Sequence, residues 1–127
     1  MGINKKRVLI VDDDEKNLKL LRIVLRNAGY ETIEAENGEQ GVKLARESRP
    51  SPIFMDMRMP VMDGITATKI LKADESTKTI PIIVITASAM KGDREKIAKE
   101  AGCDGYVAKP IDVKSFMNIV GKYLEDG

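Results

Sequence analysis

Five short aliphatic runs are the feature of this sequence that most restricts its fold. The first, residues 7–11 (RVLIV), is continuous and rich in β-branched residues, which is typical of a strand buried on both faces. Between the runs, apolar residues recur at helical spacing, and Gly29 and Gly102 mark helix ends. The predicted strands are 7–11, 30–35, 53–56, 80–86 and 106–108. The predicted helices are 15–28, 38–48, 65–73, 93–101 and 112–124.

The alternation of strand and helix, repeated five times, predicts an α/β fold. It indicates a doubly wound, five-stranded parallel sheet of the (βα)5 type, with helices on both faces. The chain has 127 residues and contains no internal repeat, low-complexity tract or linker. We therefore expect a single domain over residues 1–127, and a free-standing protein rather than a fragment.

Several classes of function are excluded by composition. The sequence contains no histidine, which excludes Ser-His-Asp and Cys-His catalysis and a role as a phosphohistidine carrier. Its single cysteine cannot form an internal disulfide. A net charge of +1 provides no general attraction to nucleic acid. Neither a membrane-spanning apolar run nor a signal peptide is recognisable, so we expect a cytoplasmic protein without nucleic-acid or membrane partners.

Polar residues follow each of the five predicted strands, and those that follow four of the strands can be assigned a role, whereas Glu36 and Asn37 after the second cannot. In open parallel sheets, ligands bind beyond the carboxyl ends of the strands, at a topological switch point. The candidate residues there are Asp12 and Asp13 after the first strand, Asp56 at the end of the third, Thr86 and Ala87 at the fourth, and Lys109 after the fifth. We expect these acids, the hydroxyl and the ammonium group to gather at one edge of the sheet.

The charges of these groups indicate a metal and a phosphoryl group. Three ionised carboxylates, from Asp12, Asp13 and Asp56, carry a charge of −3 and would repel one another. A divalent cation and Lys109 would neutralise them, and Mg²⁺ favours one or two carboxylates together with phosphate oxygens. A carboxylate can also act as a nucleophile and form an aspartyl phosphate. Thr86 could donate a hydrogen bond to a phosphate oxygen.

Four sequence motifs, in their order along the whole chain, resemble the receiver domain of bacterial two-component response regulators. The motifs are Val11-Asp12-Asp13, Met55 to Pro60 with Met62-Asp63-Gly64, Thr86-Ala87 and Lys109-Pro110. The resemblance implies a flavodoxin-like (CheY-like) fold and a phosphorylation-dependent signalling switch rather than an enzyme. It further implies self-catalysed acceptance of a phosphoryl group and slow autodephosphorylation.

The resemblance also assigns the acidic residues. Asp56 would accept the phosphoryl group from a phosphohistidine of a partner. Asp12 and Asp13 would hold Mg²⁺ (or Mn²⁺), Asp13 directly and Asp12 mainly through water, with Asp56 and the backbone carbonyl of Arg58 as further ligands. The implied partner is a sensor histidine kinase or a histidine phosphotransfer protein, and the receiver would be a monomer or a phosphorylation-dependent dimer.

A switch mechanism is implied for the other site residues. Thr86 and Lys109 would contact the phosphoryl oxygens, and Ala87 would leave room for close backbone approach. Tyr106 lies where the family has an aromatic residue that turns inward when Thr86 is drawn to the phosphoryl group. The face formed by the fourth helix, fifth strand and fifth helix would then change its affinity for a downstream partner, which the sequence does not identify.

Three alternative hypotheses are also compatible with the sequence. The sequence could be a receiver excised from a hybrid sensor histidine kinase or a larger regulator. It could be a phosphohydrolase of the haloacid dehalogenase kind with Asp12 as nucleophile, although Lys16 stands where that motif has Thr or Val. It could also be a receiver-like binding module that is not phosphorylated.

Overall fold

The computed structural model describes residues 7–86, Lys96 and residues 102–125. In that part of the chain, strands and helices alternate along most of the sequence. The elements are β1 (Arg7–Val11), α1 (Glu15–Asn27), β2 (Glu31–Ala35), α2 (Gly38–Ser48), β3 (Ile53–Asp56), α3 (Gly64–Ala73), β4 (Ile82–Thr86), β5 (Gly105–Ala108) and α5 (Val113–Glu125).

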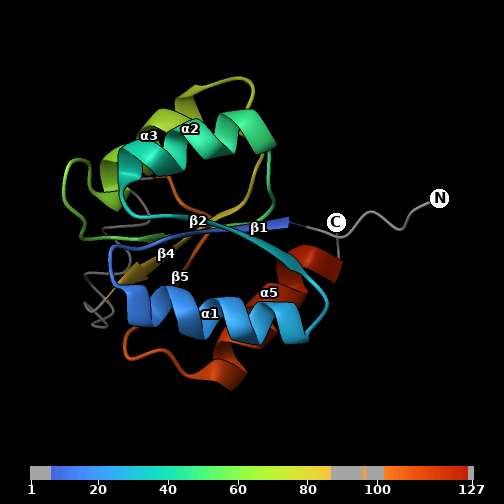
Figure 1. The fold of residues 1–127 in the computed structure, drawn as a ribbon. Helices are drawn as coiled ribbons and strands as arrows, with labels where there is room; N and C mark the ends of the chain where they lie inside the picture. The colour runs from blue at the N-terminus through green and yellow to red at the C-terminus, as the bar shows by residue number, and fades with distance from the viewer. Residues whose placement is uncertain (1–6, 87–95, 97–101, 126–127) are drawn as a thin grey trace.

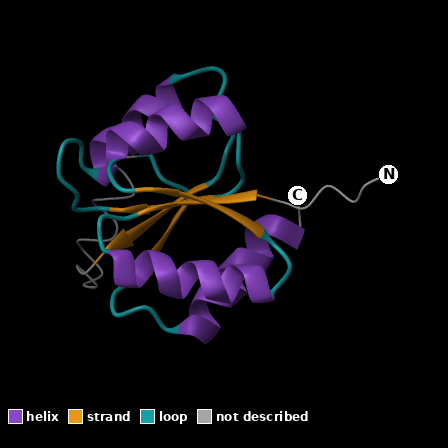
Figure 2. Cartoon of the chain, viewed as in Figure 1, coloured by secondary structure: helices purple, strands orange, loops and turns teal. Residues whose placement is uncertain are grey.

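The strands form one parallel sheet in the order β2-β1-β3-β4-β5. Figures 1 and 2 show three layers, with α2 and α3 on one face of the sheet and α1 and α5 on the other. The reversal of strand order falls beside β1, because β2 lies on one side of it and β3 on the other. The structure therefore confirms the predicted doubly wound, five-stranded parallel sheet.

Successive side chains of β1 enter two different cores, as the two-residue period of a strand requires. Val8 and Ile10 pack with buried residues of α1 and α5, whereas Leu9 and Val11 pack with buried residues of α2 and α3. All four side chains are fully buried. The structure thus confirms that the continuous aliphatic run is a strand covered on both faces.

The main difference from the predicted elements is the start of β4. The sequence predicts a strand from residue 80, but β4 begins at Ile82. The N–H of Ile80 donates to the carbonyl of Thr77 (3.0 Å) and closes the preceding turn. Pro81 has no N–H to contribute to a sheet, although its carbonyl accepts from the N–H of Ile53 (2.9 Å). The predicted helix at 93–101 lies, apart from Lys96, outside the described residues.

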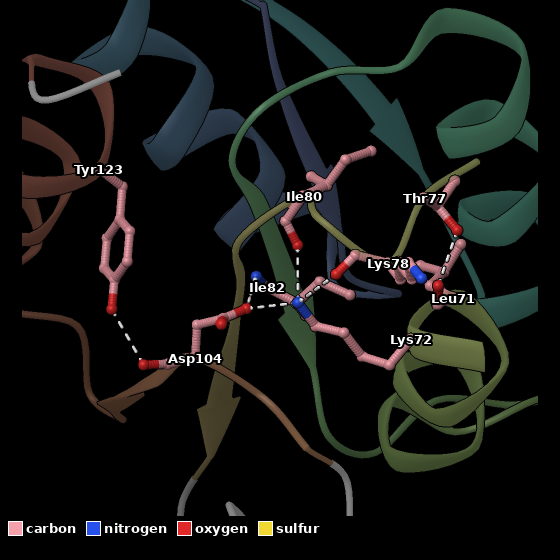
Figure 3. A network of polar contacts seen from close by, with 8 residues as sticks. All are labelled: Leu71, Lys72, Thr77, Lys78, Ile80, Ile82, Asp104 and Tyr123. Carbon is pink, nitrogen blue, oxygen red and sulfur yellow. Dashed lines mark hydrogen bonds and ion pairs between the residues drawn. The ribbon is translucent and has the colours of Figure 1, made fainter. Parts of the chain in front are cut away.

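A polar network ties together the starts of β4 and β5 (Figure 3). The ammonium group of Lys72, near the end of α3, donates to the carbonyls of Lys78 (3.2 Å) and Ile80 (2.9 Å). It also forms an ion pair with Oδ2 of Asp104 (2.7 Å), which in turn accepts from the N–H of Ile82 (2.8 Å). The side chain of Lys72 is 19% exposed, so water replaces these partners only in part if the network is broken.

Replacement of Lys72 by methionine is expected to lower the free energy of unfolding by about 1.5–3 kcal/mol, the range for hydrogen bonds that involve a charged group. Urea unfolding followed by circular dichroism measures the change. Lys78→Met is the matched control, because the Lys78 ammonium pairs with the exposed Glu75 (2.8 Å), a contact worth at most about 1 kcal/mol. Equal unfolding midpoints for the two variants would contradict a structural role for the network.

Within the described ranges, no helix combines the length and apolarity that a membrane span needs. The longest helices there, α1 and α5, have 13 residues each, which is short of the roughly 20 residues required to cross a bilayer.

Candidate functional site

Three carboxylates meet at the carboxyl ends of β1 and β3, which are neighbours in the sheet. Asp12 and Asp13 follow β1, and Asp56 is the last residue of β3. One carboxylate oxygen from each of the three lies within 4.8 Å of the others. Asp12 and Asp56 are buried, whereas Asp13 is exposed. The structure thus brings together the three acids that the sequence placed at one edge, beside the reversal of strand order.

Asp12 is held in a fixed orientation by the start of α1. Its Oδ1 accepts from the N–H of Asp14 (2.9 Å), and its Oδ2 accepts from the side-chain amide of Asn17 (3.2 Å). Burial raises the pKa of Asp12 and the negative charge of Asp56 raises it further, whereas the hydrogen bond from Asp14 opposes the shift. Asn17 is not among the residues predicted from the sequence, although its place in the first turn of the helix after Asp12 is a usable signal.

Lys109 contributes the cationic group of the site. Its Nζ lies 2.8 Å from Oδ1 of Asp56, whose side chain is only 4% exposed. The backbone N–H of Lys109 donates to the carbonyl of Thr86 (2.9 Å), which anchors the residue to the end of β4. Burial lowers the pKa of Lys109, but the hydrogen bond to Asp56 and the charges of the three acids raise it by more. Lys109 therefore stays protonated and offsets part of the acidic charge.

Backbone hydrogen bonds anchor the loop between β3 and α3 where it leaves β3 and where it enters α3. The N–H of Met57 donates to the carbonyl of Ile85 (2.9 Å), and the N–H of Gly64 donates to the carbonyl of Met57 (2.9 Å). Glycine is required at position 64, because a Cβ atom there would overlap the carbonyl oxygen of Asp56. Arg58 lies in this loop with an exposed side chain, and the ligand role of its carbonyl stays a prediction.

Thr86 and Tyr106, the proposed switch residues, lie on neighbouring strands. Thr86 is 1% exposed, and its hydroxyl donates to the sulfur of Met57 (3.6 Å). Tyr106 is half-buried and pairs in register with Val84 of β4. Their movement on phosphorylation stays a prediction, and Ala87 lies outside the described residues. The contact between Met57 and Thr86 is not predicted from the sequence.

The chemistry of this donor set fits a hard divalent cation. Carboxylate oxygens are the ligands that Mg²⁺ prefers, and an exposed carboxylate such as Asp13 leaves room for metal-bound water. The three acids carry −3 when ionised, against +1 from Lys109, so a divalent cation brings the local charge to zero. The cluster contains neither a thiolate nor an imidazole, which argues against a site for the metals that prefer sulfur or nitrogen ligands.

Comparison with known proteins identifies the family. The family model "Response regulator receiver domain" matches residues 8–121. The chain is 46% identical over 121 residues to the polar-differentiation response regulator DivK of Brucella anthropi, and the match covers 95% of this chain and 98% of that protein. Both matches extend over nearly the whole sequence rather than over one motif.

Solved structures give the same result. The receiver domain of the sensor histidine kinase PA1611 of Pseudomonas aeruginosa is 34% identical, with a TM-score of 0.87 and coverage of 96% of this chain and 99% of that one. That structure holds a magnesium ion in its active-site cleft. The receiver domain of Ssk1 of Saccharomyces cerevisiae, crystallised with the histidine phosphotransfer protein Ypd1, is 28% identical, with a TM-score of 0.85 and coverage of 97% and 91%. The chain therefore belongs to the response regulator receiver domains, a family of CheY-like signalling domains.

Proposed function

We propose that this chain is a phosphorylation-dependent switch in which Asp56 accepts a phosphoryl group from a partner phosphohistidine. The observation that carries the proposal is the acid cluster of Asp12, Asp13 and Asp56, with Nζ of Lys109 only 2.8 Å from Asp56. A carboxylate in a solely structural role would not be buried beside two other acids, because that arrangement costs desolvation and repulsion.

The residues of the site would have separate roles in phosphoryl transfer. An oxygen of Asp56 forms the new bond to phosphorus while the bond to the histidine nitrogen of the partner breaks. Asp12, Asp13, Asp56 and the carbonyl of Arg58 would hold Mg²⁺, which when bound neutralises charge on the phosphoryl oxygens. Because its ammonium already contacts Asp56, Lys109 is placed to pair with a phosphoryl oxygen after transfer.

The switch itself uses groups on β4 and β5. Thr86 would turn its hydroxyl towards a phosphoryl oxygen, Ala87 would allow close backbone approach, and Tyr106 would move inward. The surface formed by the predicted helix 93–101, β5 and α5 would then bind a downstream partner with a different affinity. This is a shift between two conformations that the phosphoryl group binds unequally.

The phosphodonor would be a sensor histidine kinase or a histidine phosphotransfer protein. The sequence contains no histidine, which supports a donor whose phosphohistidine lies outside these 127 residues. The similar receiver of Ssk1 was crystallised with a histidine phosphotransfer protein, and that of PA1611 belongs to a sensor histidine kinase. The chain would act as a monomer or as a phosphorylation-dependent dimer.

The test is to incubate the chain with acetyl phosphate and Mg²⁺ and to locate the added phosphoryl group by tandem mass spectrometry of its peptides. We expect one phosphoryl group, on Asp56, and none without the metal. A label on Asp12 would support a phosphohydrolase of the haloacid dehalogenase kind instead. An unlabelled chain whose partner affinity does not respond to beryllofluoride, a phosphoryl mimic, would support a binding module that is not phosphorylated.

A further inference from the structure

The hydroxyl of Thr86 contacts a sulfur atom in this structure. It donates to Sδ of Met57 over 3.6 Å. The Thr86 side chain is 1% exposed and Met57 is half-buried, so bulk water competes little for this contact. A thioether is a weak hydrogen-bond acceptor. The contact therefore orients the hydroxyl without binding it tightly.

The backbone fixes Met57 beside Thr86. In the pairing of β3 with β4, Asp56 lies opposite Ile85, and the hydrogen bond from the N–H of Met57 to the carbonyl of Ile85 (2.9 Å) continues this register by one step. Side chains alternate between the two faces of a sheet, so Met57 and Thr86 share a face that differs from the face of Asp56 and Ile85. The Thr86 hydroxyl is thus oriented towards Met57, the residue that follows Asp56.

We propose that Met57 is a positioning residue that holds Thr86 in its resting orientation and thereby sets how readily the phosphoryl group recruits it. The inference rests on the proposed function, since it assumes that Thr86 contacts a phosphoryl oxygen. A hydrogen bond to an anionic oxygen is stronger than one to a neutral sulfur. Phosphorylation thus favours exchange of the sulfur for the oxygen, and loss of the phosphoryl group returns the hydroxyl to Met57.

Two substitutions at Met57 are expected to act in opposite directions. Met57→Leu keeps a similar apolar volume but removes the acceptor, so the resting orientation loses a contact and binding of beryllofluoride becomes about two- to fivefold tighter. Met57→Gln supplies an amide oxygen, a better acceptor than sulfur. It stabilises the resting orientation and weakens binding by a similar factor.

The experiment measures beryllofluoride affinity in the presence of Mg²⁺ by fluorine NMR of the bound mimic. Met59→Leu is the matched control, because it makes the same chemical change two residues away in the same loop, and it is expected to leave the affinity unchanged. A double-mutant cycle adds Thr86→Val, in which the effect of Met57→Leu is expected to vanish. A second readout needs no metal: scalar couplings of the Thr86 side chain report its orientation in the apo protein and are expected to change in Met57→Leu.

The outcomes separate this inference from the proposed function. If the wild-type chain does not bind beryllofluoride, the proposed function is wrong, and the inference fails with it. If the wild-type chain binds the mimic but Met57→Leu and Met57→Gln match its affinity and the Thr86 couplings are unaltered, only the role of Met57 is overturned. Opposite shifts that disappear with Thr86→Val confirm it.

Discussion

Asp56→Asn is expected to abolish phosphorylation by acetyl phosphate. The amide of asparagine has nearly the shape of the carboxylate but lacks a nucleophilic oxygen, so the bond to phosphorus does not form. The substitution also removes one of three carboxylates from the cluster, and we expect Mg²⁺ affinity to fall by about tenfold or more. Intact-protein mass spectrometry measures the label, and calorimetric titration measures the metal affinity.

A neighbouring acid provides the control for this substitution. Asp63 lies outside the cluster and caps α3, where its side chain accepts from the N–H of Thr66 (2.7 Å). Asparagine is an equally good cap, so Asp63→Asn is expected to keep both the fold and the label. If the Asp56→Asn variant still carries a phosphoryl group, another residue is the acceptor, and the assignment of Asp56 is wrong.

Replacing Lys109 by methionine is expected to weaken the site in two ways. The buried carboxylate of Asp56 loses the ammonium group that lies 2.8 Å away, and we expect the free energy of unfolding without metal to fall by about 2 kcal/mol. This is below the 3–5 kcal/mol typical of a broken buried pair, because Lys109 is partly exposed. A phosphoryl mimic also loses a cationic partner, so beryllofluoride should bind at least about tenfold more weakly.

Urea unfolding without metal and beryllofluoride titration with Mg²⁺ measure these two effects separately. Lys114→Met removes the same charge from an exposed position on α5 and is expected to change neither quantity appreciably. If Lys109→Met binds the mimic as tightly as the wild-type chain, Lys109 is a structural partner of Asp56 and does not contact the phosphoryl group.

Much of the site could be predicted from the sequence because of a property of parallel sheets. The residue after each aliphatic run lies at the carboxyl end of a strand, and neighbouring strands present those ends at one edge. Asp12, Asp56 and Lys109 can therefore be placed together from the sequence alone, and the structure confirms that they meet. Their roles in phosphoryl transfer remain predictions that the experiments above test.

Other contacts depend on register and could not be predicted in this way. Met57 meets Thr86 because β3 and β4 pair at one particular offset. Lys72 meets Asp104 because α3 packs beside the start of β4, where the N–H of Ile82 also donates to Asp104. The start of β4 at Ile82 has a similar origin, because the turn before it uses the N–H of Ile80. Hydrophobic alternation restricts the register of a strand but does not select the partner of each side chain.

The sequence by itself determined the fold class, the edge of the sheet where the acids gather and the class of chemistry that they can perform, because these follow from local periodicity and from charge. The tertiary structure decided which groups touch. Lys109 pairs with Asp56, and the hydroxyl of Thr86 contacts Met57. These contacts join segments far apart in the chain, and packing of the whole domain is what brings such segments within hydrogen-bonding distance.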